Sequence, residues 1–154
     1  MNNVREEVLR SIKLNDDLSK LMEQALELDR TIKIGWTRDG EPNPKDGETG
    51  VAPALPKGGR IRILGNLSDC VAILSQGGSF GLEGKSGDLF GAWNNGGSLV
   101  VERSSGNHVG HSMKSGRITV WDGVSDYAGS ELSGGLLIIR GDAGVRVGAK
   151  MNDG

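Results

Sequence analysis

A glycine recurs every 19 residues through the C-terminal two-thirds of this 154-residue chain. The glycines of this series are Gly59, Gly78, Gly97, Gly116, Gly135 and Gly154. A fixed period of this size is typical of a solenoid, in which each repeat is one structural unit stacked on the last. The series therefore predicts about five equivalent coils over residues 59–154, and it indicates that most of these glycines serve the geometry of the backbone.

Three apolar columns run through the coils at fixed positions. The third position of each coil holds Ile61, Phe80, Leu99, Ile118 and Leu137, and the fifth holds Ile63, Leu82, Val101, Val120 and Ile139. The thirteenth position holds Val71, Phe90, Val109, Ala128 and Val147. Apolar residues two apart are typical of a half-buried strand, and stacking buries columns that a single coil could not bury alone. We therefore expect an all-β solenoid, a right-handed parallel β-helix, because crossovers between parallel strands prefer that hand.

Residues 1–34 follow a different pattern and predict a helical segment. Val4, Val8 and Ile12 recur every fourth residue, which is the spacing of one helix face. The polar run at residues 15–17 predicts a short helix and then a longer one with its cap at residue 15 or 16, and residues 32–36 predict a strand. An unpaired terminal coil is an edge that needs protection. The helices either cap the first coil or dock a partner subunit.

A stretch rich in proline and glycine follows over residues 35–58 and predicts a linker. It contains all the prolines of the chain, Pro42, Pro44, Pro53 and Pro56, and proline removes a donor from a β-ladder. At the other end, Gly154 begins a sixth coil. This pattern predicts either that the polypeptide was cut from a longer one or that another chain pairs with the exposed last coil.

The composition excludes several classes of protein. The net charge is −2, so no overall positive field attracts nucleic acid. The single cysteine, Cys70, excludes an intramolecular disulfide and favours a reducing compartment. The sequence contains neither an apolar stretch of about 18 residues nor a secretory leader. We expect a cytoplasmic protein whose partners are neither nucleic acids nor membranes.

Several stretches of the coils carry a family resemblance. They are Gly97–Val101 followed by Gly106–Gly110, then Gly116–Val120, and Gly135–Met151. They resemble the GXGXG β-helix domain, which closes the large subunit of glutamate synthase and forms one whole subunit of formylmethanofuran dehydrogenase. The resemblance covers residues 59–154. It implies a spacer that holds a glutaminase unit against a flavin and iron–sulfur synthase unit, with no catalytic residue to carry over.

The chain departs from the multi-domain enzymes of that family in ways that bear on chemistry. Residue 2 is Asn2, so the amidotransferase cysteine is missing at the start, and Cys70 lies in the middle of a coil. An iron–sulfur centre needs about four thiolates, and this chain has one cysteine. We therefore expect no catalytic or cofactor-binding residue here, and we expect FMN and iron–sulfur clusters only in partner subunits.

Two glycine-rich motifs match enzyme signatures in part. Residues 77–81 fit the nucleophile-elbow pattern around Ser79, but that motif needs a strand before the serine and a helix after it. Residues 84–86 resemble the end of a phosphate loop, but the first glycine of that motif would fall on Ser79. Both motifs are predicted to be turns of the solenoid. A partnership of Ser79 with His108 or His111 stays open, because coils bring distant residues together.

Two sets of side chains are candidate metal ligands. His108 and His111 flank a turn, and Asp88 or Asp126 on a neighbouring coil would supply the third ligand that zinc needs. The eleventh position forms a column of Asp69, Asp88, Asn107 and Asp126, which could bind calcium. The alternative, which we favour, is that the histidines are solvated and that Asp and Asn bond their own backbone in turns.

An outward row of side chains is the predicted docking surface. The twelfth position lies beside an inward column and holds Cys70, Leu89, His108, Tyr127 and Arg146. Trp93 and Trp121 are also expected to face outward, and tryptophan is enriched at interface hot spots. The predicted interface residues are Trp93, Trp121, His108, Tyr127 and Arg146. The alternative is that each tryptophan packs along its own coil.

The expected function is that of a non-catalytic structural or interaction subunit. The resemblance points to a glutamate-synthase-like amidotransferase–oxidoreductase assembly, in which this chain would position the glutaminase and synthase units. One alternative is the equivalent β-helical component of a formylmethanofuran-dehydrogenase-type complex. Another is a module that associates with itself through the open C-terminal coil.

Overall fold

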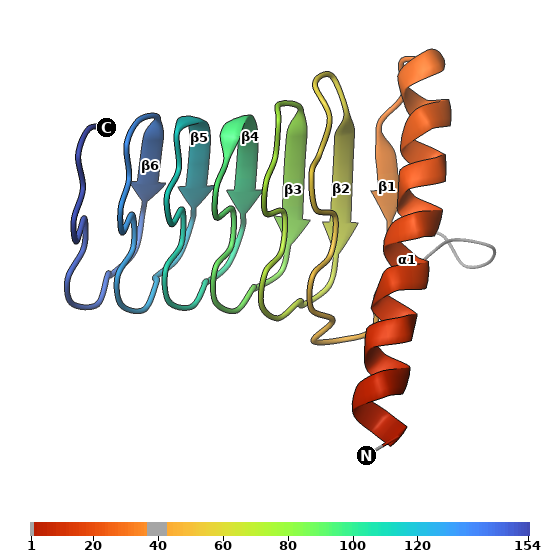
Figure 1. Cartoon of the computed structure of the whole chain (residues 1–154), viewed down its shortest axis with the longest axis horizontal. Coiled ribbons are helices and arrows are strands. Elements are labelled where there is room, and N and C mark those ends of the chain that lie inside the picture. Colours follow the sequence, from red (N-terminus) through yellow and green to blue (C-terminus); the bar gives the residue numbers. More distant parts are fainter. Residues whose placement is uncertain (1, 37–42) are drawn as a thin grey trace.

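The computed structural model describes residues 2–36 and 43–154 and shows a helix followed by a stack of parallel strands (Figure 1). Helix α1 spans Asn2–Glu27. The strands of the described ranges are β1 (Ile32–Ile34), β2 (Arg60–Leu64), β3 (Ser79–Glu83), β4 (Asn95–Val101), β5 (Ser115–Val120) and β6 (Leu136–Ile139). They form one sheet in the order β1 to β6, and each neighbouring pair is parallel. The predicted parallel β-solenoid is confirmed.

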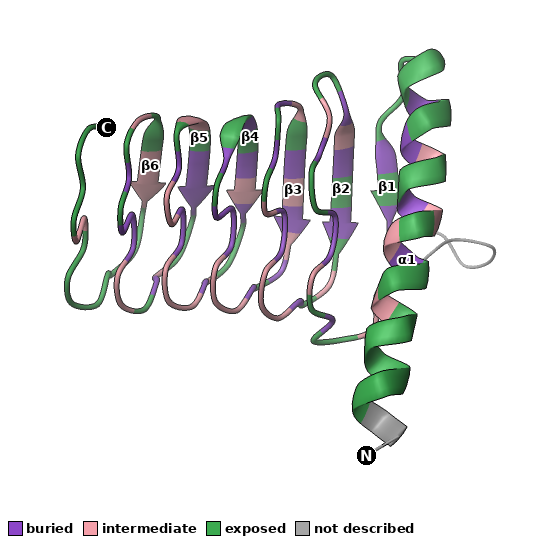
Figure 2. Cartoon of the chain, in the orientation of Figure 1, coloured by how far each residue is buried: buried purple, intermediate pink, exposed green. Residues whose placement is uncertain are grey.

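The register of the sheet explains the 19-residue period. From β2 onward, Phe80 pairs with Leu99, Leu99 with Ile118, and Ile118 with Leu137. One coil therefore advances the chain by one strand spacing, about 4.8 Å. These paired side chains point into the solenoid, and Phe80, Leu99 and Ile118 are buried there. Figure 2 shows buried stretches in β1 to β5, whereas β6 is intermediate or exposed along its length.

Every glycine of the 19-residue series has a close neighbour where a Cβ would stand, and at Gly78 and Gly116 the nearest is the backbone of the preceding coil. A Cβ added to Gly116 would lie 2.5 Å from the carbonyl oxygen of Gly97, and one added to Gly78 would meet the carbonyl oxygen of Gly59. A real Cβ atom does not tolerate so close a contact. The recurrent glycine is thus a steric requirement of stacking.

On the side of each coil opposite the sheet, φ is positive at every second residue. In the coil that follows β4, φ is 58° at His108, 69° at Gly110 and 52° at Ser112, the twelfth, fourteenth and sixteenth positions. The N–H groups then bond alternately to the next coil and to the previous one. The N–H of His108 donates to the carbonyl of Asp126, and that of Gly110 to the carbonyl of Phe90, both at 2.9 Å. Each coil is therefore bonded to both neighbours without a regular strand on this side.

Over residues 47–58, the stretch predicted to be a linker is part of an additional coil. β1 pairs with β2, and Glu48 forms an isolated parallel bridge with Leu67. Val51 and Leu55 are buried in the common core. The predicted count of about five coils is slightly off. Residues 37–42 of the predicted linker lie outside the described residues.

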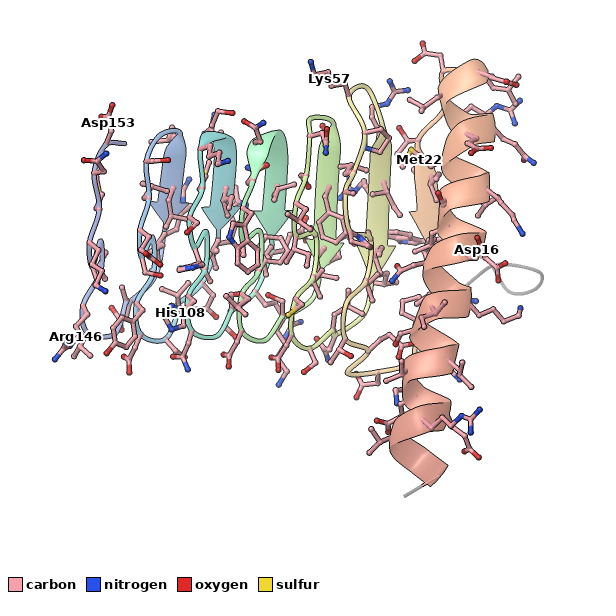
Figure 3. All side chains as sticks on the ribbon, viewed as in Figure 1. Asp16, Met22, Lys57, His108, Arg146 and Asp153 are labelled. Carbon is pink, nitrogen blue, oxygen red and sulfur yellow. The ribbon has the colours of Figure 1, made fainter. Side chains whose placement is uncertain are left out.

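Helix α1 is one continuous element, so the prediction of a short and a longer helix was wrong. Asn15 does not cap a second helix, because its side chain bonds the first coil at Gly50 and Ala52. Leu14, Leu18 and Met22 are buried in the same core as that coil. Met22 lies on the side of α1 that faces β1 (Figure 3). Helix α1 therefore covers the first coil along its C-terminal half.

The last coil has a neighbouring coil on one side only. The thirteenth-position column is fully buried from Val71 to Ala128, whereas Val147 is 55% exposed. Met151 is also exposed, and Leu137 is only partly buried against the core. Burial in this column therefore requires a coil on each side.

Candidate functional site

Four of the five predicted interface residues come together on the side of the solenoid opposite the sheet. Trp93, His108, Tyr127 and Arg146 lie on four successive coils, and His111 joins them. We call these five residues the imidazole–aromatic cluster. Figure 3 shows His108 and Arg146 along the same edge of the molecule.

The rings of the cluster touch one another without a gap. The centroids of Trp93 and His111 are 5.5 Å apart, and those of His111 and His108 are 5.6 Å apart, both edge to face. The His108 ring stacks on Tyr127 at 4.9 Å with an interplanar angle of 11°. The Arg146 guanidinium lies 5.8 Å from the centroid of the Tyr127 ring. Aromatic pairs at such distances contribute about 0.5–1.5 kcal/mol each beyond the area they bury.

The repeat itself places these side chains. His108 and Tyr127 both occupy the twelfth position of their coils, so stacking the coils stacks the rings. Their φ values of 58° and 62° are positive, as are those of Cys70, Leu89 and Arg146 at the same position. Positive φ in a non-glycine residue is often a sign of a functional site. Here it recurs in every one of these coils, so it belongs to the architecture of the solenoid.

Two imidazoles share one buried hydroxyl below the cluster. The Nδ1 atoms of His108 and His111 lie 2.9 and 2.8 Å from the Oγ of Ser130. The Nε2 of His111 lies 3.3 Å from a carboxylate oxygen of Glu131 and 3.3 Å from the Oγ of Ser112. Ser130 is 4% exposed, so these protein groups are its partners instead of bulk water.

The shared hydroxyl determines how protons are placed on the two neutral rings. A serine hydroxyl donates one hydrogen and accepts others, so it donates to one Nδ1 and accepts from the other. Which of the two imidazoles donates to Ser130 depends on the tautomer of each ring. The hydrogen-bond partner of His111 Nε2 is the Oγ of Ser112, and a carboxylate oxygen of Glu131 lies at the same distance from that atom. The hydrogen bonds thus link His108, Ser130, His111 and Ser112 in one chain.

This hydrogen-bonded set of side chains resembles a hydrolase triad in composition, but its serine is not accessible to a substrate. The Ser130 hydroxyl donates to one imidazole, accepts from the other and is buried, so no substrate carbonyl can reach it as the structure stands. Ser79, the serine of the nucleophile-elbow motif, begins β3 on the outward face of the sheet. The two histidines lie on the opposite side of the coils, so the structure does not bring Ser79 to either of them.

The candidate metal ligands are engaged in other contacts. Nδ1 of each histidine bonds Ser130, and the Oδ1 atoms of Asp88 and Asp126 accept backbone N–H groups. Within residues 2–36 and 43–154, no group of three or more His, Cys, Asp or Glu side chains is arranged to hold a metal ion.

The column at the eleventh position ties successive coils together. Oδ1 of each member accepts the backbone N–H of the residue 19 positions later, at 2.8 to 3.0 Å; the acceptors are Asp69, Asp88, Asn107 and Asp126. The expectation that these side chains bond their own backbone was therefore wrong in its detail. Val145 occupies the next position, and its backbone N–H donates the last of these bonds, to Oδ1 of Asp126. An amide and a carboxylate serve equally in this column, which indicates a structural role.

Trp121 lies apart from the cluster. It follows β5 and is exposed, and the Arg140 guanidinium lies 4.3 Å from the centroid of its ring. A cation–π contact of this kind contributes about 0.5–1 kcal/mol at an exposed site. The five predicted interface residues thus form two separate surfaces.

Comparisons with known proteins leave the family of this chain open. No family model matches it, and neither a curated protein nor a solved structure matches it. No helix within the described ranges is long and apolar enough to cross a membrane.

Proposed function

We propose that this chain is a non-catalytic scaffold that binds a partner protein through the imidazole–aromatic cluster. The observation that most supports this proposal is the continuous row of contacts across four coils, from the Trp93 ring through the two imidazoles and the Tyr127 ring to the Arg146 guanidinium. Tryptophan, tyrosine and arginine are the residues most enriched at binding hot spots. Trp93, His108 and Tyr127 lie on coils that are bonded on both sides, which holds these side chains in place and lowers the entropy lost on binding.

The hydrogen bonds of the polar groups near the cluster support a structural role for these groups over a catalytic one. Ser130 joins the two histidines, and the eleventh-position column joins the coils. A catalytic nucleophile needs an open approach and an adjacent base. The groups with suitable chemistry in this region are bonded to the protein, and the exposed surface they leave is aromatic.

The resemblance to the GXGXG β-helix domain suggests the kind of partner. In this proposal the chain positions a glutaminase unit relative to a synthase unit carrying FMN and an iron–sulfur cluster, and the assembly works in the cytoplasm. Right-handed winding of the coils belongs to the same proposal, because parallel crossovers prefer that hand. Partners typical of a formylmethanofuran dehydrogenase would instead favour the second assembly of that family.

Affinity purification of the full chain from its source cells tests this proposal. We expect the chain to recover the glutaminase and synthase units. We expect the Trp93→Ala/Tyr127→Ala double variant to recover at least about tenfold less, a difference of about 1.4 kcal/mol. Leu64→Ala is the matched control, because Leu64 is exposed on the sheet side.

Each outcome of that purification is informative. A chain that recovers no specific partner contradicts the scaffold function. Partners of another enzyme class contradict the glutamate-synthase-like assembly but keep the scaffold. Equal recovery by the double variant and the parent would show that the cluster is not the binding surface.

A further inference from the structure

The N-terminal half of α1 carries an apolar stripe that no residue within 2–36 or 43–154 covers. Val4, Val8, Leu9 and Ile12 are 68, 53, 54 and 60% exposed. Each of residues 4–10 is exposed, and burial against the coils begins only at Leu14. Figure 1 shows this end of α1 extending beyond the coils, and Figure 2 shows it as exposed.

The composition of this stripe indicates a partner. Valine and isoleucine have restricted side chains in a helix and lower its intrinsic stability. A helical segment without packing is marginal in water at this length. Apolar residues at every fourth position form one face, which is typical of a surface that packs against another element. The stripe therefore has the character of an interface.

A groove continues along the same side of the helix. It has a volume of 390 Å³ and lies between the C-terminal half of α1 and residues 52–56. Its apolar lining includes Leu18, Met22, Leu26, Ala52, Leu55 and Pro56. At about 100° per residue, Val8, Ile12 and Leu26 lie within about 40° of one another around the helix axis. The stripe and the groove therefore form one continuous surface.

The charges of α1 suit a copy of the same helix in the opposite direction. The first turn has no acidic residue and the last turn no basic one, so neither end complements the helix dipole. Arg5 lies near the N-terminal end, whereas Glu23 and Glu27 lie near the C-terminal end. Of the other charges on this arm, Glu6 lies about 100° from Arg5 around the helix axis. Glu7 pairs with Lys45, Arg10 with Glu48 and Lys13 with Asp17.

We propose that two copies of this chain associate through α1, with the helices antiparallel. Two helices of 26 residues overlap over about 39 Å, and the first turns of one then lie beside the last turns of the other. The Val4–Val8–Ile12 stripe of each copy packs along the groove of the second copy. Arg5 of each copy lies near the second copy's Glu23 and Glu27. The contact is self-complementary, as a twofold interface must be.

Sedimentation of the full chain over a concentration series tests the association. We expect a reversible dimer, and a monomer for Val8→Glu/Ile12→Glu. Both positions are exposed, so the variant should keep the circular dichroism and unfolding midpoint of the parent monomer. Val145→Glu is the matched control in the last coil, where Val145 is 62% exposed. A dimer lost with Val145→Glu and kept by the helix variant would overturn the proposal, as would a monomer at every concentration.

Charge reversal tests the direction of the helices. We expect Arg5→Glu to raise the dimer dissociation constant at least about threefold, and Glu23→Lys/Glu27→Lys in the same chain to restore it. A second arm uses Cys70→Ser chains carrying either Arg5→Cys or Glu23→Cys. Disulfides should form between the two kinds of chain when they are mixed. Disulfides between two Arg5→Cys chains alone would show parallel helices and overturn the proposal. The Trp93→Ala/Tyr127→Ala variant should stay dimeric, so this test is independent of the scaffold function.

Discussion

The side-chain oxygen Oδ1 of Asn15 accepts a hydrogen bond from the backbone N–H of Ala52 at 2.9 Å. Its Nδ2 donates to the carbonyl of Gly50 at 2.7 Å. In the next coil the N–H of Ala72, the counterpart of Ala52, donates instead to the backbone of the preceding coil at Val51. The side-chain amide of Asn15 in α1 therefore bonds the first coil where, in the next coil, the backbone of a preceding coil makes the bond. This contact protects the first coil from pairing with another chain.

Replacing Asn15 with alanine should destabilise the protein by about 1–3 kcal/mol, because two backbone groups of the first coil lose their partner. Urea unfolding followed by circular dichroism measures this change. Ser19→Ala is the control, since Ser19 is an exposed residue one turn further along the helix. Equal midpoints for Asn15→Ala and Ser19→Ala would show that the amide does not hold α1 to the coil.

Leu99 tests the inward column. It is fully buried in β4, so Leu99→Ala should cost about 2–5 kcal/mol through the cavity it leaves. Leu99→Asp places a charge without a partner among aliphatic side chains and should prevent folding. Thermal unfolding compares these variants with Leu64→Asp, a change at an exposed position of β2. A Leu99→Asp protein that melts with the parent would contradict the assigned core.

Gly110 tests the positive-φ corner. Its φ is 69°, and a Cβ there would make only ordinary contacts, the nearest at 3.4 Å from the Cδ1 of Ile118, so the backbone conformation decides the cost of a substitution. Gly110→Ala should cost about 1 kcal/mol or more, and Gly110→Val more than that, because a β-branched residue resists this region. Gly81→Ala is the control, since Gly81 has no positive φ and its added Cβ makes only ordinary contacts with Arg62. A Gly81→Ala protein that is less stable than the Gly110→Val protein in chemical unfolding would contradict this account.

Asp88 tests the eleventh-position column. Its Oδ1 accepts the N–H of Asn107 at 2.8 Å, so Asp88→Ala should lose about 1–2 kcal/mol. Asp88→Asn should keep most of the stability, because the amide of Asn107 already makes the same bond to Asp126 at 2.9 Å. Asp142→Ala, at an exposed position, serves as the comparison in denaturant unfolding. A loss of stability for Asp88→Asn as large as that for Asp88→Ala would show that the negative charge of Asp88 is needed.

The shared hydroxyl of Ser130 makes a prediction about tautomers. Long-range proton–nitrogen NMR spectra at a pH where both rings are neutral should show one of His108 and His111 protonated on Nδ1 and the other on Nε2, because the hydroxyl donates to one Nδ1 and accepts from the other. Ser130→Ala removes the hydroxyl that distinguishes the rings, so the tautomer preference of His108 should fall. Trp121→Ala is a control that leaves both rings untouched. Two rings with the same tautomer in the parent would contradict the proposed hydrogen-bond chain.

The fold could be predicted because its steric requirements repeat. A close approach of backbone to backbone at Gly116 recurs at Gly78, and each recurrence leaves a glycine in the sequence. The inward columns repeat for the same reason, as the burial of Leu99 and Ile118 shows. Residues 47–58 could not be assigned to a coil in this way, because their spacing departs from the period and their prolines are typical of a linker.

The candidate site could be predicted in part. A separation of 19 residues places Tyr127 over His108 and Ser130 over His111, so the period contained both contacts. Ser130 and Glu131 were nevertheless missed, because an isolated serine or glutamate in a turn looks like any solvated residue. Trp121 was grouped with the cluster on residue type alone, and the structure places it on another surface.

By itself the sequence determined that successive coils stack in parallel, because glycines and apolar side chains must recur wherever one backbone lies on another. Only the tertiary structure decided that residues 2–27 form a single helix and that residues 47–58 complete a coil. Asn15 lies 35 residues from Gly50, and their hydrogen bond outweighs the local preference of asparagine for a helix end. Contacts between segments so far apart have no signature in either segment alone.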